Sequence, residues 1–258
     1  MSSIPVVTLE SVGPVAQICF TSESNRNALS SALRREFLAA LKQVESNPDI
    51  RVVVLTHSGK VFSSGLDLTE ISHESLGQAL TELTEILDLL ENYSKPLVCK
   101  LGGPAIAGGL GIVAACDFVI ASDDLKFSFS EVRIGVSPAI ISRFVLRKMN
   151  PRKATEYLLS GISFTSADAY THGLINVCCQ RQDLENVTSE YIEQLLKIEP
   201  TAFIESKKLL LAQQKGAVDV SEIIEISKSM FLSESAAEGR SALKDKRKPS
   251  WDISGDTQ

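Results

Sequence analysis

Apolar and polar residues alternate along the first half of the chain in two different patterns. Short apolar runs bounded by turn residues predict β-strands, and longer stretches with apolar residues three or four positions apart predict helices. The expected strands cover residues 6–9, 15–20, 52–55, 96–100, 118–121, 127–129 and 174–177. The run at 52–55 is apolar at every position, which is typical of a strand in a sheet that is covered on both faces.

Helical patterns become more frequent toward the C-terminus. The first expected helix runs from Leu29 to the stop at Asn47-Pro48, because its apolar residues recur at helical spacing. Further helices are expected at residues 76–90, 152–159, 166–172, 184–198, 201–213 and 221–248. The pattern therefore predicts a mixed α/β core, residues 1–195, followed by a helical C-terminal region, residues 196–258.

The stretch from Lys100 to Pro138 contains the strongest candidate for a binding site. Gly108, Gly109 and Gly111 open a short apolar helix that follows an expected strand. Glycine lets backbone N–H groups approach a ligand closely, and the first N–H groups of a helix have no acceptor within the helix. The pattern favours a site for an anion, or for an oxygen that becomes negatively charged during a reaction. A tight turn with close helix packing would produce the same pattern.

Charge and composition narrow the choice of function. The net charge is −6, which disfavours broad binding to nucleic acid or to an acidic membrane surface. The longest apolar run, residues 105–121, is shorter than the roughly 20 residues of a membrane span, and no secretory leader is apparent. Five cysteines without CxxC spacing predict reduced thiols, in the cytoplasm or in another reducing compartment such as a mitochondrial matrix. The scattered histidines predict no metal site.

Four segments with distinctive motifs follow one another along the chain. They are Asn25-Arg26-Asn27-Ala28-Leu29, Phe62-Ser63-Ser64-Gly65-Leu66-Asp67-Leu68, the glycine-rich run from Gly103 to Asp117, and the run from Phe127 to Pro138 that contains Ser130-Glu131. In this order they resemble the enoyl-CoA hydratase/isomerase (crotonase) family over nearly the whole chain. The resemblance implies an α/β crotonase-like spiral of strand–strand–helix units. It also implies a C-terminal helical region that builds a homotrimer or a homohexamer.

The resemblance further implies that the ligand is an acyl-CoA thioester, so that coenzyme A is part of the substrate and no separate cofactor is expected. In the family, two backbone N–H groups hold the thioester oxygen as it becomes an enolate, and we match them to Ser64 and Gly108. Each donor of this kind typically lowers the barrier by about 3–4 kcal/mol. The substrate-binding residues implied by the resemblance are Arg26, Ala28, Gly65, Leu66, Asp67 and Gly109.

The carboxylates depart from the family pattern. Hydratases of the best-known type carry two glutamates, of which the later one matches Glu131, whereas the earlier position holds Gly111. Glycine cannot exchange a proton, so a two-glutamate addition of water cannot run in its usual form. The leading interpretation is an enoyl-CoA hydratase that adds water across the 2,3 double bond with Glu131 as the acid/base. A single group in that role contributes roughly 100- to 10,000-fold.

Other interpretations stay open at this point. A double-bond isomerase or an acyl-CoA decarboxylase needs only one base beside the oxyanion hole, and a non-catalytic acyl-CoA-binding paralogue would also account for Gly111. The segment around Glu131 resembles hydratases of branched dicarboxylic substrates as well. Arg133 or Arg143 is therefore a candidate cation for a dicarboxylic acyl group.

Overall fold

The computed structural model describes residues 4–255, which divide into two compact units between Ser189 and Glu190. Unit 1 contains all the β-strands, and unit 2 is helical. The division falls within α7 (Leu184–Leu195), a little before the boundary that the sequence predicts at residue 195. The mixed α/β class predicted for the first part of the chain is confirmed.

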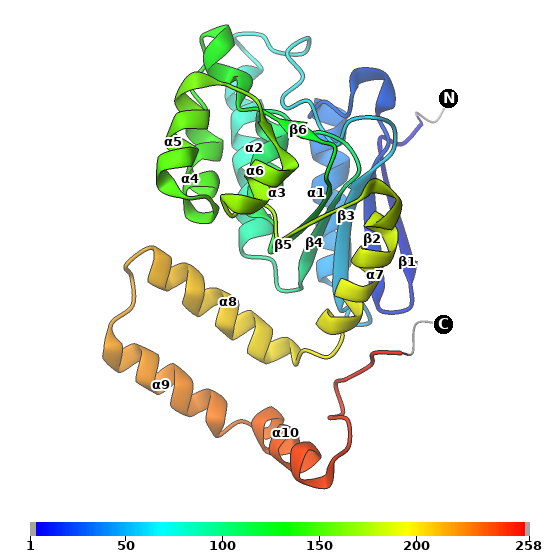
Figure 1. The fold of residues 1–258 in the computed structure, drawn as a ribbon, viewed down its shortest axis with the longest axis vertical. Coiled ribbons are helices and arrows are strands. Elements are labelled where there is room, and N and C mark those ends of the chain that lie inside the picture. The colour runs from blue at the N-terminus through cyan, green and yellow to red at the C-terminus, as the bar shows by residue number, and fades with distance from the viewer. Residues whose placement is uncertain (1–3, 256–258) are drawn as a thin grey trace. The chain divides into compact units, whose positions relative to one another are not determined.

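Unit 1 is built on a six-stranded sheet that is parallel except at one edge (Figure 1). In spatial order its strands are β1 (Val7–Val12), β2 (Val15–Phe20), β3 (Val52–His57), β4 (Leu97–Leu101), β5 (Phe118–Ser122) and β8 (Val177–Cys179). Only the neighbours β1 and β2 run antiparallel. The first five residues of β3 are buried, as the uninterrupted apolar run predicts for a strand covered on both faces.

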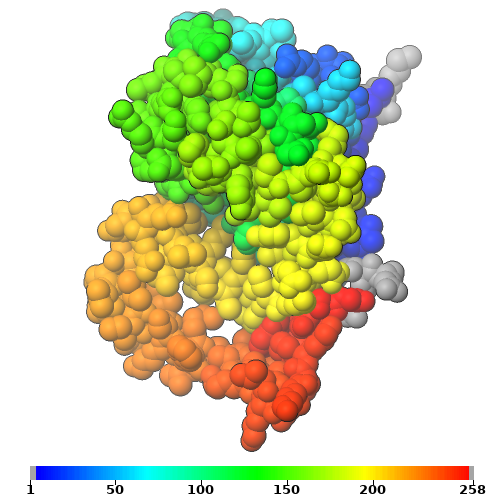
Figure 2. Space-filling model, viewed as in Figure 1, coloured from blue at the N-terminus to red at the C-terminus, as the bar shows by residue number. Residues whose placement is uncertain are grey.

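The described part of unit 1 contains six complete helices, some packed on the sheet and others on neighbouring helices (Figure 1). They are α1 (Ser31–Glu45), α2 (Leu76–Glu91), α3 (Gly108–Ala115), α4 (Ala139–Lys148), α5 (Pro151–Ser160) and α6 (Ser166–Thr171). Helix α1 packs on β1 and β2, α2 packs on both α1 and α3, and α4 packs on α3. Figure 2 shows α4 and α5, in green, covering one side of the unit.

Shorter elements complete unit 1. A two-stranded antiparallel ribbon joins β6 (Lys126–Phe127) to β7 (Phe164–Thr165). Single 3₁₀ turns occur at η1 (Glu23–Asn25), η2 (Ser130–Ile134) and η3 (Arg181–Asp183). Helix α4 has no counterpart among the helical ranges expected from the sequence.

The strand predicted at 174–177 is displaced toward the C-terminus. Leu174 and Ile175 are buried in the core, but the Leu174 N–H donates to the Ala169 carbonyl at 2.8 Å and so closes the turn after α6. The Asn176 side chain then accepts from the Val119 N–H at 2.8 Å. Regular pairing with β5 begins only at Val177. The apolar residues Leu174 and Ile175 therefore pack in the core without belonging to the strand.

Unit 2 consists of helices that follow the end of α7. They are α8 (Pro200–Gln214), α9 (Val220–Phe231) and α10 (Glu234–Asp245). The prediction of a single helix at 221–248 is wrong, because the chain forms two helices there, α9 and α10. The Ser233 hydroxyl accepts from the Ala236 N–H at 3.1 Å and so caps the start of α10. A serine that caps a helix N-terminus in this way interrupts a continuous helical pattern.

Candidate active site

The loops that follow three neighbouring parallel strands are joined to one another by backbone hydrogen bonds. The Ile106 N–H, after β4, donates to the Ser63 carbonyl, after β3, at 2.9 Å. The Ala107 N–H donates to the Ser128 carbonyl, after β5, at 3.1 Å. The carboxyl ends of parallel strands share one edge of a sheet, where ligands of α/β proteins generally bind. Segments far apart in the sequence therefore meet at this edge.

Unusual backbone conformations bring two amides together here. Gly65 has a φ of +88°, and a Cβ at this position would lie 3.0 Å from the Ala107 Cβ and 3.1 Å from the Gly108 nitrogen. Ala107, the residue before α3, has a φ of 50° and a ψ of −122°, a conformation that typically costs about 1–3 kcal/mol for a residue with a side chain. A Cβ at Gly108 would lie 3.6 Å from the Leu66 nitrogen. The amides of Leu66 and Gly108 are thus close neighbours.

The amide of Ser64 is arranged differently from the sequence-based expectation. Its N–H donates to the Arg26 carbonyl at 3.2 Å. By contrast, the N–H groups of Leu66 and Gly108 have no hydrogen-bond acceptor within residues 4–255. Gly108 is the first residue of α3, where an N–H has no acceptor within the helix. The geometry therefore favours Leu66, rather than Ser64, as the partner of Gly108 in holding a ligand oxygen.

Glu131 supplies a carboxyl group at the same place. It lies in η2, where its side chain is half-buried, and its Oε2 is buried without a hydrogen-bond partner in the described part of the chain. Burial raises the pKa of this carboxyl group, opposed only by its own backbone N–H. A carboxylate whose pKa is raised by burial is a stronger base, which favours uptake of a proton from a ligand beside it.

These groups line one cavity of about 370 Å³. Its walls are mainly apolar: Leu80 and Leu83 come from α2, and Ile134, Ile140 and Ile141 come from η2 and α4. The lining contains no lysine, arginine or histidine side chain within the described chain. The cavity can therefore accept a hydrocarbon group with a single oxygen-binding end, next to one carboxyl group.

The structure brings only some of the predicted residues into this cavity. Ser64, Leu66, Gly108 and Glu131 line it. The predicted substrate-binding residues that lie outside the lining are Arg26, Ala28, Gly65, Asp67 and Gly109. Their role toward coenzyme A stays a prediction.

The residues outside the lining have evident local roles. Ala28 is 5% exposed and its carbonyl accepts from the Ser30 N–H at 2.7 Å. The Asp67 carboxylate accepts from the Thr69 hydroxyl at 2.7 Å and from the Asn25 amide at 3.2 Å. The Thr69 hydroxyl is the main cause that lowers the pKa of Asp67, so this side chain fastens the loop that carries Leu66.

Gly109 has a packing role, because a Cβ there would lie 2.8 Å from the Ser63 carbonyl oxygen. Arg26 has an exposed side chain and a φ of 60°, and its carbonyl holds the Ser64 amide. Both residues therefore shape the loops around the cavity without lining it.

The two arginines considered for a dicarboxylic substrate do not reach the cavity. Arg143 forms an ion pair with Asp88, and its guanidinium lies 4.6 Å from the centre of the Phe144 ring. Arg133 is exposed and passes close to Gly161. Neither is among the lining residues, and the interpretation that one of them binds a second carboxylate stays a prediction without support from this lining.

Sequence reasoning missed the apolar walls of the cavity. Leu76, Leu80 and Leu83 recur at helical spacing on α2, a pattern that is equally typical of a core-facing stripe. Ile141 was also missed, although it lies against Gly111, where the earlier of the two hydratase glutamates would stand. No signal in the sequence pairs Ile141 with Gly111, because the contact joins two different helices.

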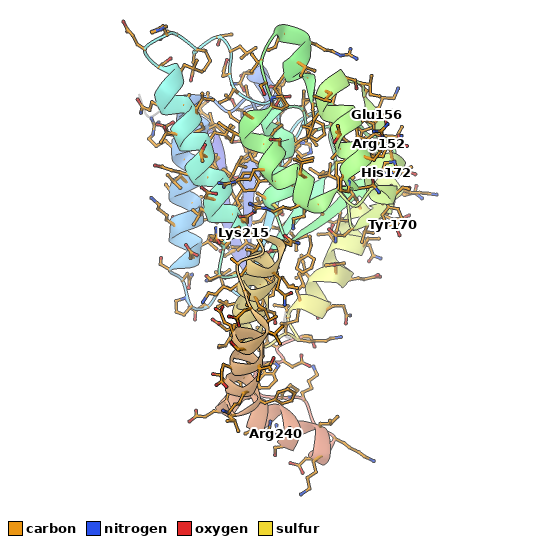
Figure 3. All side chains as sticks on the ribbon, turned by 90° about the vertical axis from the view of Figure 1, so that its left-hand side faces the viewer. Arg152, Glu156, Tyr170, His172, Lys215 and Arg240 are labelled. Atoms are coloured by element: carbon orange, nitrogen blue, oxygen red, sulfur yellow. The ribbon has the colours of Figure 1, made fainter. Side chains whose placement is uncertain are left out.

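The histidines are not gathered at the cavity. Figure 3 shows His172 near Arg152, Glu156 and Tyr170, on the side of unit 1 formed by α5 and the end of α6. Within residues 4–255 no three side chains of the metal-binding types cluster. None of the helices described is long and apolar enough to cross a membrane.

Residues 10–254 match the family described as enoyl-CoA hydratase/isomerase. The chain is 32% identical to 4-chlorobenzoyl coenzyme A dehalogenase-2 of an Arthrobacter species, over 73% of this chain and 71% of that protein. It is 28% identical to the hydroxycinnamoyl-CoA hydratase-lyase of Pseudomonas fluorescens, over 78% of this chain and 76% of that protein.

A solved structure agrees over nearly the whole length. The crystal structure of an enoyl-CoA hydratase from Shewanella pealeana matches with a TM-score of 0.88 at 28% identity, covering 96% of this chain and 97% of that one. The expected crotonase-like fold is thereby confirmed. The names of the relatives span several reactions, so the likeness alone does not select one.

Proposed function

Because the chain belongs to the enoyl-CoA hydratase/isomerase family, we propose that it adds water across the 2,3 double bond of an enoyl-CoA thioester. The observation that carries the proposal is the meeting of three groups in one cavity: the unpaired amides of Leu66 and Gly108 and the unpaired carboxyl oxygen of Glu131. The amides suit an oxygen that gains negative charge, and the carboxyl group suits a proton that must be moved.

The thioester oxygen accepts hydrogen bonds from the N–H groups of Leu66 and Gly108. As water adds to C3, negative charge moves through C2 onto this oxygen, and two fixed donors stabilise it without reorganising. Each donor of this kind is typically worth about 3–4 kcal/mol of the barrier. The strained conformation of Ala107 supports the assignment, because it directs the first amide of α3 toward the cavity.

Glu131 moves the proton. Its carboxylate takes a proton from the water molecule while the water oxygen forms its bond to C3. The protonated carboxyl group then returns that proton to C2, so that one molecule of water is added and the carboxylate is regenerated. Burial raises the pKa of Glu131, which makes its carboxylate a stronger base toward the proton of the water molecule.

Double-bond isomerisation is the second candidate. Gly111 offers no proton-carrying side chain, and the hydrocarbon of Ile141 lies against it. In this reaction Glu131 takes a proton from C2 of a 3-enoyl thioester and returns it to C4, while the same amides hold the enolate oxygen. Only one carboxyl group is required, which is what the cavity contains.

We propose further that the acyl group is an uncharged hydrocarbon. The lining is dominated by leucine, isoleucine and valine side chains, and among residues 4–255 its only charged member is Glu131, an acid. A second carboxylate on the substrate would meet no cation there. Unpaired charge in such surroundings is costly.

The experiment that tests the function follows the absorbance of the conjugated enoyl thioester. Loss of absorbance with 2-hexenoyl-CoA indicates hydration, and gain of absorbance with 3-hexenoyl-CoA indicates isomerisation. Glu131→Gln is expected to lower the active reaction by about 100- to 10,000-fold. Glu85→Gln, an exposed change on α2, is the matched control and should leave the rate unaltered. Neither reaction with any enoyl-CoA, alongside intact acyl-CoA binding, would instead support a non-catalytic paralogue.

We also propose that unit 2 assembles the chain into a homotrimer or homohexamer. Its helices expose large apolar side chains, which favours contact with another protein surface. Six such side chains are Leu210, Val220, Ile224, Phe231, Leu232 and Leu243. Light scattering that gives the mass of one chain would contradict the assembly.

The five unpaired thiols fit a reducing compartment, the cytoplasm or a mitochondrial matrix.

A further inference from the structure

Gly111 faces a hydrocarbon wall made by two other helices. A Cβ at position 111 would lie 2.5 Å from Cγ2 of Ile141 on α4, 3.2 Å from its Cβ and 3.3 Å from Cδ1 of Leu87 on α2. Real side chains do not approach so closely. Position 111 therefore has no room for any side chain. A glutamate is not only absent from this position but would also clash with Ile141 there.

The wall cannot easily move aside. Ile141 is 3% exposed and Leu87 is fully buried, and both belong to the main core cluster. Cγ2 is attached directly to the Cβ of a branched residue on a helix, so its position is set by one stiff torsion rather than by a flexible chain end. A close-packed core resists the insertion of even one carbon.

Ile141 also lines the cavity that contains Glu131. The same side chain thus closes the space above Gly111 and presents hydrocarbon to the substrate. We propose that Ile141 determines the number of carboxyl groups in the site and limits it to one. This inference rests on the proposed function. Its consequence is that the proton taken up by Glu131 is the proton that Glu131 returns.

The steric part of the inference is tested by a double-mutant cycle read as thermal unfolding. Gly111→Ala adds only the Cβ and is expected to lower Tm by about 2 °C or more. Gly77→Ala is the matched control, because a Cβ at Gly77 in α2 meets nothing within 4 Å, and its Tm should stay equal or rise. In an Ile141→Ala background, Gly111→Ala should no longer lower Tm. An equal loss of Tm in both backgrounds would overturn the assignment.

The chemical part is tested by Gly111→Glu with and without Ile141→Ala. Alone, Gly111→Glu should lower Tm and leave no second carboxylate in the pH dependence of kcat. In the Ile141→Ala background, Gly111→Glu should lower Tm by less than it does in the wild type, and it should add a second ionisation to the pH profile of the reaction. The proposal fails if Gly111→Glu alone keeps the wild-type Tm and shows two ionisations.

Failure of this inference can be told apart from failure of the proposed function. The stability cycle uses no substrate, so it decides whether Ile141 excludes a side chain from position 111 even if hydration and isomerisation are both absent. A wild-type enzyme that is active but already shows two carboxylate ionisations would overturn the single-carboxylate assignment and leave the oxyanion site untouched.

Discussion

The apolar lining of the cavity leads to a strong prediction about which acyl groups bind. Saturated thioesters report binding without turnover, so the pair to compare is hexanoyl-CoA and adipoyl-CoA, whose six-carbon chains differ by a terminal carboxylate. No cation lines the cavity within the described residues, and Glu131 carries charge of the same sign. An unpaired buried charge costs about 1–3 kcal/mol or more. Adipoyl-CoA should therefore bind about 10- to 100-fold more weakly.

A longer hydrocarbon chain on the thioester should strengthen binding, whereas a terminal carboxylate weakens it. Each buried methylene contributes about 0.8 kcal/mol, so the two additional carbons of hexanoyl-CoA relative to butanoyl-CoA are worth about 1.6 kcal/mol. That difference corresponds to binding that is about 14-fold tighter. Free coenzyme A serves as the reference, because its own contribution is common to all three thioesters.

Titration calorimetry on the wild type and two variants provides the measurement. Ile134→Arg places a cation at an exposed position of the lining, where Ile134 is 59% exposed, and should improve adipoyl-CoA binding about tenfold without improving hexanoyl-CoA binding. Leu146→Arg, on the exposed side of α4 and outside the lining, is the matched control and should change neither. Equal affinity of the wild type for hexanoyl-CoA and adipoyl-CoA would refute the reasoning.

Two further predictions concern the loops that hold the amides. Ala107→Gly removes the strain of the positive φ and should raise the free energy of unfolding by about 1 kcal/mol, measured by denaturant unfolding. The same change should lower kcat, measured by steady-state kinetics, because the Gly108 amide is then held less firmly. Asp67→Asn should lower Tm at pH 7. The depressed pKa of Asp67 means that its carboxylate stabilises the fold above about pH 4 and loses this effect as the pH falls through the folded-state pKa. The Tm difference from wild type should therefore shrink in acid, and a pH-independent difference would contradict this explanation.

The sequence by itself determined the class of the fold and the segments that carry the site. Apolar periodicity located α1, and the predicted stripe of Leu33, Phe37 and Leu41 is fully buried. The motifs around Gly65, Gly108 and Glu131 were located through the resemblance to the family, whose motifs are short runs of consecutive residues. A left-handed backbone, a helix start and a short acidic turn are all written in a few consecutive residues.

Only the tertiary structure shows which backbone amides at the proposed site already have an acceptor and which do not. The Ser64 amide is occupied by the carbonyl of Arg26, a residue from a different loop, and this leaves Leu66 to pair with Gly108. The space beside Gly111 is filled by Ile141, thirty positions further along the chain. Hydrogen-bond direction and occupied volume depend on neighbours that are distant in sequence. The order of residues along the chain does not show these contacts, because they form only when the helices and loops pack together.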